Sequence, residues 1–183
     1  DRAVYGTPAI ANGVVYFGGY DGILYALTLD DGSEVWDTPV GDSSPIVGGP
    51  VVADRLVLVG SSDGSVYAFD SESGSLEWSF ETANDVWSSP AVSDGVVFIG
   101  SLDHNVYAVG LEDGTERWRF AAEGAVTATP VVTGGRVYVG SFSSSFFALD
   151  AGTGSMVWRF DGAEKWFWGG AVADESTIYA PSL

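Results

Sequence analysis

Aspartate and glutamate are the most numerous potentially catalytic or metal-binding residues in this sequence, with 25 among 183 residues. A calcium site needs roughly six to eight oxygen ligands that converge on one point. The carboxylates here are instead distributed along the chain in short segments that also carry glycine and serine. They are Asp21, Asp63 and Asp103 in one kind of segment, and Asp30, Asp31, Glu72, Glu112 and Asp113 in another. We therefore interpret them as turn formers and solvated charge.

The single histidine, His104, limits other kinds of catalysis. A serine nucleophile needs a neighbouring base, and His104 stands in a predicted turn. Histidine is among the residues that are enriched at positive φ, so we interpret His104 as a turn residue. Cysteine is absent from the sequence, which excludes disulfides and thiolate metal sites.

A repeat of about 40 residues organises the chain. Trp36, Trp78, Trp118 and Trp158 are spaced by 42, 40 and 40 residues. Each follows a glycine by four residues, and these glycines are Gly32, Gly74, Gly114 and Gly154. Other series keep the same phase, among them Pro8, Pro50, Pro90 and Pro130, and Ala26, Ala68, Ala108 and Ala148. A repeat of this length made of strands indicates propeller blades or a β-solenoid.

Residues 88–120 show what one repeat contains. The segment SSPAVSDG predicts a short strand that ends in a tight Asp94-Gly95 turn, since both residues tolerate positive φ. Three further strands follow, VVFIGS, NVYAVGL and ERWRF, separated by the turns LDHN and LEDGTE. Asp21-Gly22 and Asp63-Gly64 replace the first of these turns in earlier copies, and such pairs are strong hairpin signals. No segment shows the 3.6-residue apolar period of a helix.

We therefore predict an all-β fold, a β-propeller built of four-stranded antiparallel blades, with residues 1–183 as a single, partial propeller. The expected blades are residues 4–42, 43–84, 85–123 and 124–163. An incomplete fifth blade occupies residues 164–183, where AVADESTIYAPSL matches AVSDGVVFIGSL of the third copy. Because a closed propeller usually has four to eight complete blades, we expect this chain to be part of a larger propeller.

The charge balance excludes two classes of partner. Seven basic residues face 25 acidic ones, for a net charge of −18. This opposes binding to nucleic acid and to anionic lipid, because such interfaces need clustered lysine and arginine. No apolar run approaches the roughly 20 residues of a membrane span, so we expect no membrane insertion by this chain, and it shows no targeting segment. An acidic, lysine-poor surface suits either a high-salt habitat, where salt screens the repulsion, or an ordinary secreted protein.

The succession of G-S-x-D-G, x-V-Y-A and W-x-F resembles the PQQ-like (quinoprotein-type) β-propeller repeat. The matching segments are SSDGSVYAFDSESGSLEWSF and SLDHNVYAVGLEDGTERWRF. This family includes quinoprotein alcohol dehydrogenases, sensor ectodomains and outer-membrane assembly-factor lipoproteins that only bind other proteins, and the resemblance is closest in style to the last. It implies an extracytoplasmic location, periplasmic or at the cell surface. It also implies a blade-docking role for the repeated glycines and tryptophans, Gly32 with Trp36, Gly74 with Trp78, Gly114 with Trp118, and Gly154 with Trp158.

A dehydrogenase of this family would need PQQ, a Ca²⁺ ion held by oxygen ligands, a catalytic aspartate, an arginine near the quinone and an aromatic floor, usually with a disulfide of adjacent cysteines. This chain has no cysteine, and its carboxylates are spread over the repeats. We therefore expect no catalytic, cofactor-binding or metal-binding residues. The leading hypothesis is a non-catalytic scaffold for a protein partner or a small ligand. The alternatives are a fragment of a PQQ- and calcium-dependent dehydrogenase and an extracytoplasmic sensor domain.

The candidate interaction residues are aromatics outside the repeat frame, Trp87, Trp166, Phe167 and Trp168. All of them precede the first strand of a blade, a segment that leads in propellers toward one rim of the central channel. Exposed aromatics near a polar rim often anchor a partner. Packing between blades is the alternative interpretation, since strands themselves favour aromatics.

The fourth copy departs from the others after its second strand. Ser143, Ser144 and Ser145 follow there, where the second copy has Asp63-Gly64. Either this loop is longer and flexible, or it faces a partner, and the sequence leaves both interpretations open.

Overall fold

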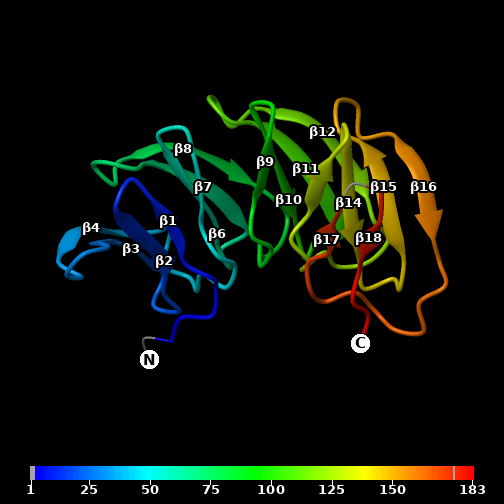
Figure 1. Cartoon of the computed structure of the whole chain (residues 1–183), viewed down its shortest axis with the longest axis horizontal. Helices are drawn as coiled ribbons and strands as arrows, with labels where there is room; N and C mark the ends of the chain where they lie inside the picture. The colour runs from blue at the N-terminus through cyan, green and yellow to red at the C-terminus, as the bar shows by residue number, and fades with distance from the viewer. Residues whose placement is uncertain (1–2, 175) are drawn as a thin grey trace. The chain divides into compact units, whose positions relative to one another are not determined.

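The computed structural model describes residues 3–174 and 176–183, and every regular element in them is a β-strand. These residues form four four-stranded sheets and one two-stranded sheet, all antiparallel (Figure 1). Glycine, serine and aspartate interrupt the chain too often for a helix, and none of the described residues belongs to a helix long and apolar enough to cross a membrane. The predicted all-β class and the four-stranded antiparallel blades are therefore confirmed.

The strands fall into two compact units, Asp1–Pro90 and Ala91–Leu183. Strands pair in chain order within each sheet, so each sheet is one blade. The first unit holds blade 1, made of β1 (Ala9–Ala11), β2 (Val14–Gly18), β3 (Ile23–Thr28) and β4 (Glu34–Pro39). Blade 2 consists of β5 (Val51–Ala53), β6 (Leu56–Gly60), β7 (Ser65–Asp70) and β8 (Leu76–Glu81).

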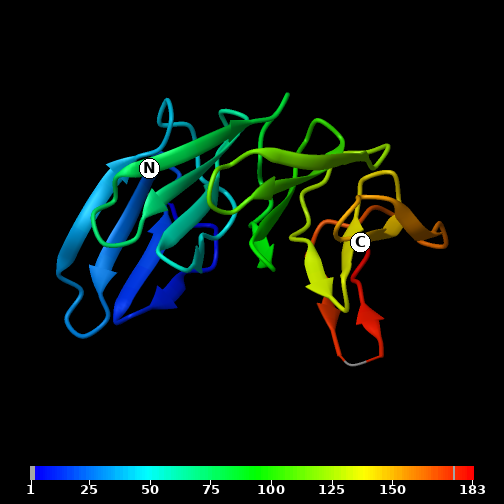
Figure 2. The ribbon, with the colours of Figure 1, turned by 90° about the horizontal axis from the view of Figure 1, so that it is seen from above.

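The second unit holds two complete blades and a two-stranded sheet. Blade 3 consists of β9 (Ala91–Ser93), β10 (Val96–Gly100), β11 (Asn105–Gly110) and β12 (Glu116–Ala121). Blade 4 consists of β13 (Val131–Thr133), β14 (Arg136–Gly140), β15 (Phe146–Asp150) and β16 (Met156–Phe160). Blade 5 is formed by β17 (Val172–Ala173) and β18 (Ile178–Tyr179). It lies beside blade 4, where β17 contacts β13 (Figure 1, Figure 2).

The first two strands of a blade are joined by turns with positive φ. Asp94 has a φ of 51° and Gly95 a φ of 73°, which confirms the predicted tight turn between β9 and β10. Such turns match the right-handed twist of the strands that they connect. The same combination occurs in blades 1 and 4, at Asn12-Gly13 and Gly134-Gly135.

His104 adopts the left-handed conformation that its place in the repeat requires. Its φ is 75°, and Gly22 and Gly64 have φ values of 73° and 90° at the same position. Its interpretation as a turn residue is therefore confirmed, since histidine tolerates this conformation better than most residues do.

The serine-rich turn of the fourth copy has the same length as the other turns. The Ser141 N–H donates to the Ser145 carbonyl at 3.0 Å, as the Ser101 N–H does to the Asn105 carbonyl at 3.0 Å. Ser144 takes the left-handed conformation, with a φ of 63°, that glycine supplies in blades 1 and 2. The interpretation as a longer loop is wrong, because the turn has no extra residue and Ser144 adopts the conformation that the turn requires.

Each fourth strand places its tryptophan directly opposite an alanine of the third strand. The pairs are Ala26–Trp36, Ala68–Trp78, Ala108–Trp118 and Ala148–Trp158. The register shifts immediately after the alanine in all four blades, at a β-bulge. Cross-strand neighbours share one face of a sheet, so the small alanine leaves room for the indole. This explains why the alanines keep phase with the tryptophans.

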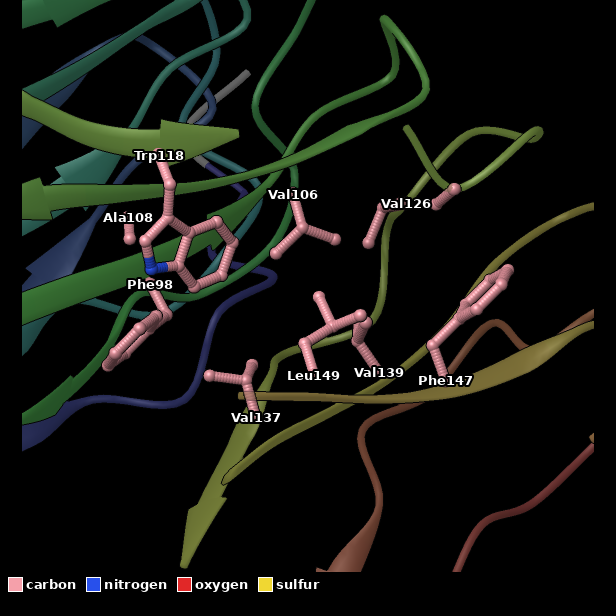
Figure 3. Close-up of a cluster of buried hydrophobic side chains, with 10 residues drawn as sticks. Phe98, Val106, Ala108, Trp118, Val126, Val137, Val139, Phe147 and Leu149 are labelled. Carbon is pink, nitrogen blue, oxygen red and sulfur yellow. The ribbon is translucent and has the colours of Figure 1, made fainter. Parts of the chain in front are cut away.

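The apolar cores lie between blades. In the second unit, Phe98 and Trp118 of blade 3 share one core with Val137 and Leu149 of blade 4 (Figure 3). Blades 1 and 2 share an equivalent core that includes Trp36. Strands that are covered on both faces need apolar residues on both faces, and segments such as RVYVGS have them.

Candidate interaction surface

Three aromatic side chains of the second unit form an exposed group. Phe142 stacks against Trp166 and Trp168, with ring centroids 5.6 Å and 5.4 Å away and interplanar angles of 27° and 28°. Trp166 is 46% exposed and Trp168 is 50% exposed. We call Phe142, Trp166 and Trp168 the aromatic cluster. Ring stacking of this kind holds the two indoles in place while their outer surfaces remain in solvent.

Hydrogen bonds from neighbouring segments fix the backbone of the aromatic cluster. The Thr127 hydroxyl donates to the Trp168 carbonyl at 3.2 Å. The Phe142 N–H, in the turn after β14, donates to the Ala125 carbonyl at 2.9 Å. A partner that binds here would therefore meet side chains that are already ordered, which lowers the entropic cost of association.

For Phe167, one of the four candidate interaction residues, the structure supports the alternative interpretation, packing between blades. Its side chain is only 3% exposed, and its ring lies 5.2 Å from that of Phe146. A side chain added to Gly140 would collide with Phe167, just as one added to Gly100 would collide with Val126. Phe167 therefore occupies a repeated core position, where an apolar side chain covers the glycine that ends a second strand.

Trp87, the remaining predicted rim residue, belongs to the first unit and is partly buried. Its Nε1–H lies 3.0 Å from the Ser62 hydroxyl and 3.1 Å from a carboxylate oxygen of Asp85. The indole is thus tied to the turn after β6, and its polar edge is satisfied within the unit.

Two further exposed aromatics in the first unit were not among the predicted interaction residues. Tyr5 is 68% exposed and Tyr20 is 46% exposed, and their rings lie 5.4 Å apart. Their positions in the repeat could have predicted both. Tyr5 stands three residues before Pro8, and Trp87 stands three residues before Pro90. Tyr20 likewise holds the place of Phe142, which was also missed.

The repeated tryptophans meet glycines of the following blade. In the first unit, Trp36 Nε1–H donates to the Ser71 carbonyl at 3.1 Å, and a Cβ on Gly74 would lie 2.7 Å from the indole. In the second unit, Trp118 Nε1–H donates at 2.9 Å to the carbonyl three residues before Gly154. A Cβ on Gly154 would lie 2.6 Å from the Trp118 indole. Both indoles therefore need a residue without a side chain beside them.

The other predicted docking residues lie in turns and strands. A Cβ on Gly32 would meet no described atom within 4 Å, so Gly32 serves its turn, with a φ of 71°. Gly114 has a φ of 64° in the turn before β12, and Trp78 lies on β8. Trp158 lies on β16 and is 38% exposed. The docking role of the eight residues as a set stays a prediction.

The aspartates that follow the second strands of blades 1, 2 and 3 accept hydrogen bonds within their own turns. An Asp103 carboxylate oxygen accepts from the Asn105 N–H at 2.9 Å, and the other accepts from the Tyr107 hydroxyl at 2.6 Å. Burial, followed by this bond to Asp103, raises the pKa of Tyr107. Asp21 and Asp63 accept from a tyrosine in the same way. No group of three or more histidine, aspartate or glutamate side chains within residues 3–174 and 176–183 could hold a metal ion.

A second set of carboxylates organises the turns before the fourth strands. The hydroxyls of Ser33 and Thr28 lower the pKa of Asp31 to about 2. Hydrogen bonds within the turns also lower the pKa of Asp70, Asp113 and Asp150, with the largest contributions from Ser73, Thr115 and Thr153 respectively. In each case the ionised form accepts bonds that the protonated form loses.

We expect these turns to make the fold sensitive to acid. Because the folded pKa of each aspartate is depressed, its stabilising contribution is complete above the ordinary value of 3.8 and is lost as the pH falls through the folded pKa. Thermal melts should show a nearly constant melting temperature from neutral pH to about pH 5, and a steep fall between about pH 4 and pH 2. Asp31→Asn should be less stable than the parent at neutral pH and should lose less on acidification. An equal acid loss in the variant would contradict this assignment.

The sequence matches the profile of one protein family, described as the outer membrane protein assembly factor BamB, over residues 2–89 and 83–168. A comparison with the curated proteins finds no match.

Many solved structures resemble the fold, among them three with TM-scores of 0.78 to 0.86. The crystal structure of BamB from Moraxella catarrhalis has a TM-score of 0.85 and 20% identity, and the match covers 100% of this chain and 60% of that one. The computationally designed Ika8 protein has a TM-score of 0.86 and 18% identity, with 96% and 54% covered. Quinohemoprotein alcohol dehydrogenase ADHIIG from Pseudomonas putida HK5 has a TM-score of 0.78 and 23% identity, with 89% and 34% covered. The chain spans 60% or less of the length of each, and the likeness shows the fold, a partial β-propeller.

Proposed function

Because the chain belongs to the family of the outer membrane protein assembly factor BamB, which is built of PQQ-like propeller repeats, we propose that it is a non-catalytic scaffold that binds a protein partner. The observation that carries this proposal is the aromatic cluster. Two indoles are about half exposed on a framework of strands and hydrogen-bonded turns. Tryptophan is enriched among the few residues that carry most of the binding energy at protein interfaces.

The charge of the chain narrows the kind of partner. A net charge of −18 favours association with a neutral or basic surface and repels an acidic one. The aromatic cluster would supply the apolar contact, and the net negative charge of the chain would steer the encounter. We also propose an extracytoplasmic location, which is supported by the name of the matching family and its reference to outer membrane protein assembly.

The proposal is tested by the contribution of single indoles to binding. A library of displayed 12-residue peptides is selected on the immobilised chain, and the affinity of one enriched peptide is measured for variants. We expect Trp168→Ala and Trp166→Ala each to weaken binding at least tenfold, because loss of a hot-spot residue costs more than about 1.4 kcal/mol. Tyr179→Ala removes an aromatic side chain of similar exposure, 55%, outside the aromatic cluster and should leave the affinity unchanged. Selection without enriched peptides, or equal affinities for all variants, would refute the proposal.

A second candidate function is that of a fragment of a PQQ- and calcium-dependent dehydrogenase. The structural likeness to the quinohemoprotein alcohol dehydrogenase favours it. The described residues do not fit a calcium ion, because their carboxylates accept bonds within separate turns and no three of them converge. A thermal shift or a change in quinone absorbance on addition of PQQ with Ca²⁺ would favour this candidate over the scaffold.

A further inference from the structure

A pocket of about 340 Å³ lies between blades 3 and 4 of the second unit. Its apolar wall includes Val96, Phe98 and Val132, and the turn residues Asp94 and Gly152 also line it. Both blades are complete four-stranded sheets, so the pocket belongs to a contact between neighbouring blades inside the unit. Its volume falls in the range of small-molecule sites in proteins, about 300–1,000 Å³. A small molecule could therefore occupy it.

The first unit shows which polar group this pocket lacks. Tyr16 of blade 1 holds the place of Phe98 in the repeat. The ring of Tyr16 lies 5.8 Å from that of Trp36 at 45°, and the ring of Phe98 lies 5.8 Å from that of Trp118 at 43°. The Tyr16 hydroxyl and the Trp36 Nε1–H both donate to the Ser71 carbonyl, each at 3.1 Å. Because Phe98 has no hydroxyl, the second unit lacks the first of these two donors.

The Ala151 carbonyl takes the place of the Ser71 carbonyl in the second unit. It accepts the Trp118 Nε1–H at 2.9 Å, and it accepts no second hydrogen bond from residues 3–174 and 176–183. A carbonyl oxygen has two lone pairs, and Ala151 lines the pocket. A ligand could therefore donate the hydrogen bond that a tyrosine hydroxyl donates in the first unit.

Asp94 adds a negative charge to the pocket. One of its carboxylate oxygens accepts from the Ser93 hydroxyl at 2.9 Å, and the other accepts no hydrogen bond from the described part of the chain. The Asp94 carboxylate and the Ala151 carbonyl are both acceptors. A ligand that complements them donates hydrogen bonds and carries a positive charge, which the net charge of −18 also favours.

We propose that the pocket between blades 3 and 4 binds a small aromatic amine. The ammonium group pairs with the Asp94 carboxylate, and such a charge-assisted hydrogen bond is roughly twice as strong as a neutral one. The ring packs against Val96 and Val132, and a hydroxyl or N–H on the ring donates to the Ala151 carbonyl. This inference rests on the pocket and on the repetition of the structure, and it does not depend on the proposed function.

Tyramine is a suitable probe, because it combines an ammonium group, one ring and one ring hydroxyl. Titrated into the ¹⁵N-labelled chain, it should shift the backbone amide signals of Gly135 and Gly152, which line the pocket. The dissociation constant should be roughly 0.1–1 mM for a ligand of this size. Phenethylamine lacks the ring hydroxyl, and tyrosol carries a neutral hydroxyl in place of the ammonium group. Each should bind at least threefold more weakly than tyramine, because each loses one hydrogen bond.

Two substitutions identify the site, and each copies a residue of blade 1. Asp94→Asn removes the charge and keeps the turn, since Asn12 holds this place in blade 1 with a φ of 50°. It should weaken tyramine binding at least fivefold. Phe98→Tyr supplies the hydroxyl that Tyr16 directs to a carbonyl in blade 1, and it should lower the affinity for tyramine to that for phenethylamine. Asp54→Asn is the control, because it removes a carboxylate from the equivalent turn of blade 2 and should leave binding unchanged.

Three results would overturn the inference. Absence of shifts at Gly135 and Gly152, or equal losses in Asp94→Asn and Asp54→Asn, would show that only the overall negative charge attracts tyramine. Equal affinities for tyramine and tyrosol would exclude a role of the Asp94 carboxylate. Tighter binding of tyrosylglycine amide, which carries the same groups at the start of a peptide, would assign the pocket to a polypeptide and not to a free amine. Trp168→Ala should bind tyramine as the parent chain does, so that failure of the proposed function leaves this result intact.

Discussion

Replacing Trp118 by alanine is expected to lower the free energy of unfolding by about 3–5 kcal/mol, the range measured for tryptophan and phenylalanine truncations in protein cores. The indole is 8% exposed and lies in the core that blades 3 and 4 share (Figure 3). Its removal would leave a cavity between the two sheets. The Ala151 carbonyl, which accepts the Nε1–H in the parent chain, would lose its hydrogen-bond donor. Both losses act on the same interface, so the effect should be large.

Urea denaturation followed by tryptophan fluorescence and far-ultraviolet circular dichroism measures this effect. The unfolding midpoint should fall by roughly 1–2 M, given the usual dependence of stability on urea. Trp158→Ala is the matched control, because it removes the same side chain at the same repeat position where the indole is 38% exposed. It should cost less than half as much as Trp118→Ala. Equal losses for the two variants would show that the indole does not stabilise the contact between blades.

Replacing Gly154 by alanine should destabilise the chain by about 2–4 kcal/mol through two separate effects. The first is steric, because the new Cβ would lie 2.6 Å from two carbons of the Trp118 indole. The second is conformational, because Gly154 has a φ of 71°, which disfavours residues with a side chain. The ring is held by neighbours on blade 3, including Phe98 at 5.8 Å, so it cannot move aside cheaply.

Gly32 separates these two effects. It occupies the same repeat position with the same φ of 71°, but a Cβ there would meet no described atom within 4 Å. Gly32→Ala should therefore cost only the conformational part, about 1–2 kcal/mol. The difference between the two variants, measured by urea denaturation, isolates the contact with Trp118. If Gly32→Ala were as destabilising as Gly154→Ala, the glycine would be needed for its turn and not for the tryptophan.

The blades and their turns could be predicted from the sequence, because these features depend on residues that are close along the chain. Asp94 and Gly95 predicted a tight turn through their tolerance of positive φ, and the structure has it. His104 was correctly interpreted from the glycines at its place in other copies. Strand content followed from short apolar segments between such turns, a local pattern that repetition reinforces.

The contacts between side chains could not be predicted in this way, because packing between sheets brings together residues that are far apart in the sequence. The glycine that meets Trp118 is Gly154 of the next copy, which only the placement of two sheets reveals. Phe167 was grouped with Trp166 and Trp168 as an aromatic outside the repeat frame, yet its side chain covers Gly140 and is buried. The aromatic cluster likewise exists only in three dimensions, since Phe142 comes from the turn after β14 and reaches Trp168 across 26 residues of sequence. Local conformational preferences can be read from one chain segment, whereas the partners of a side chain depend on how separate segments pack.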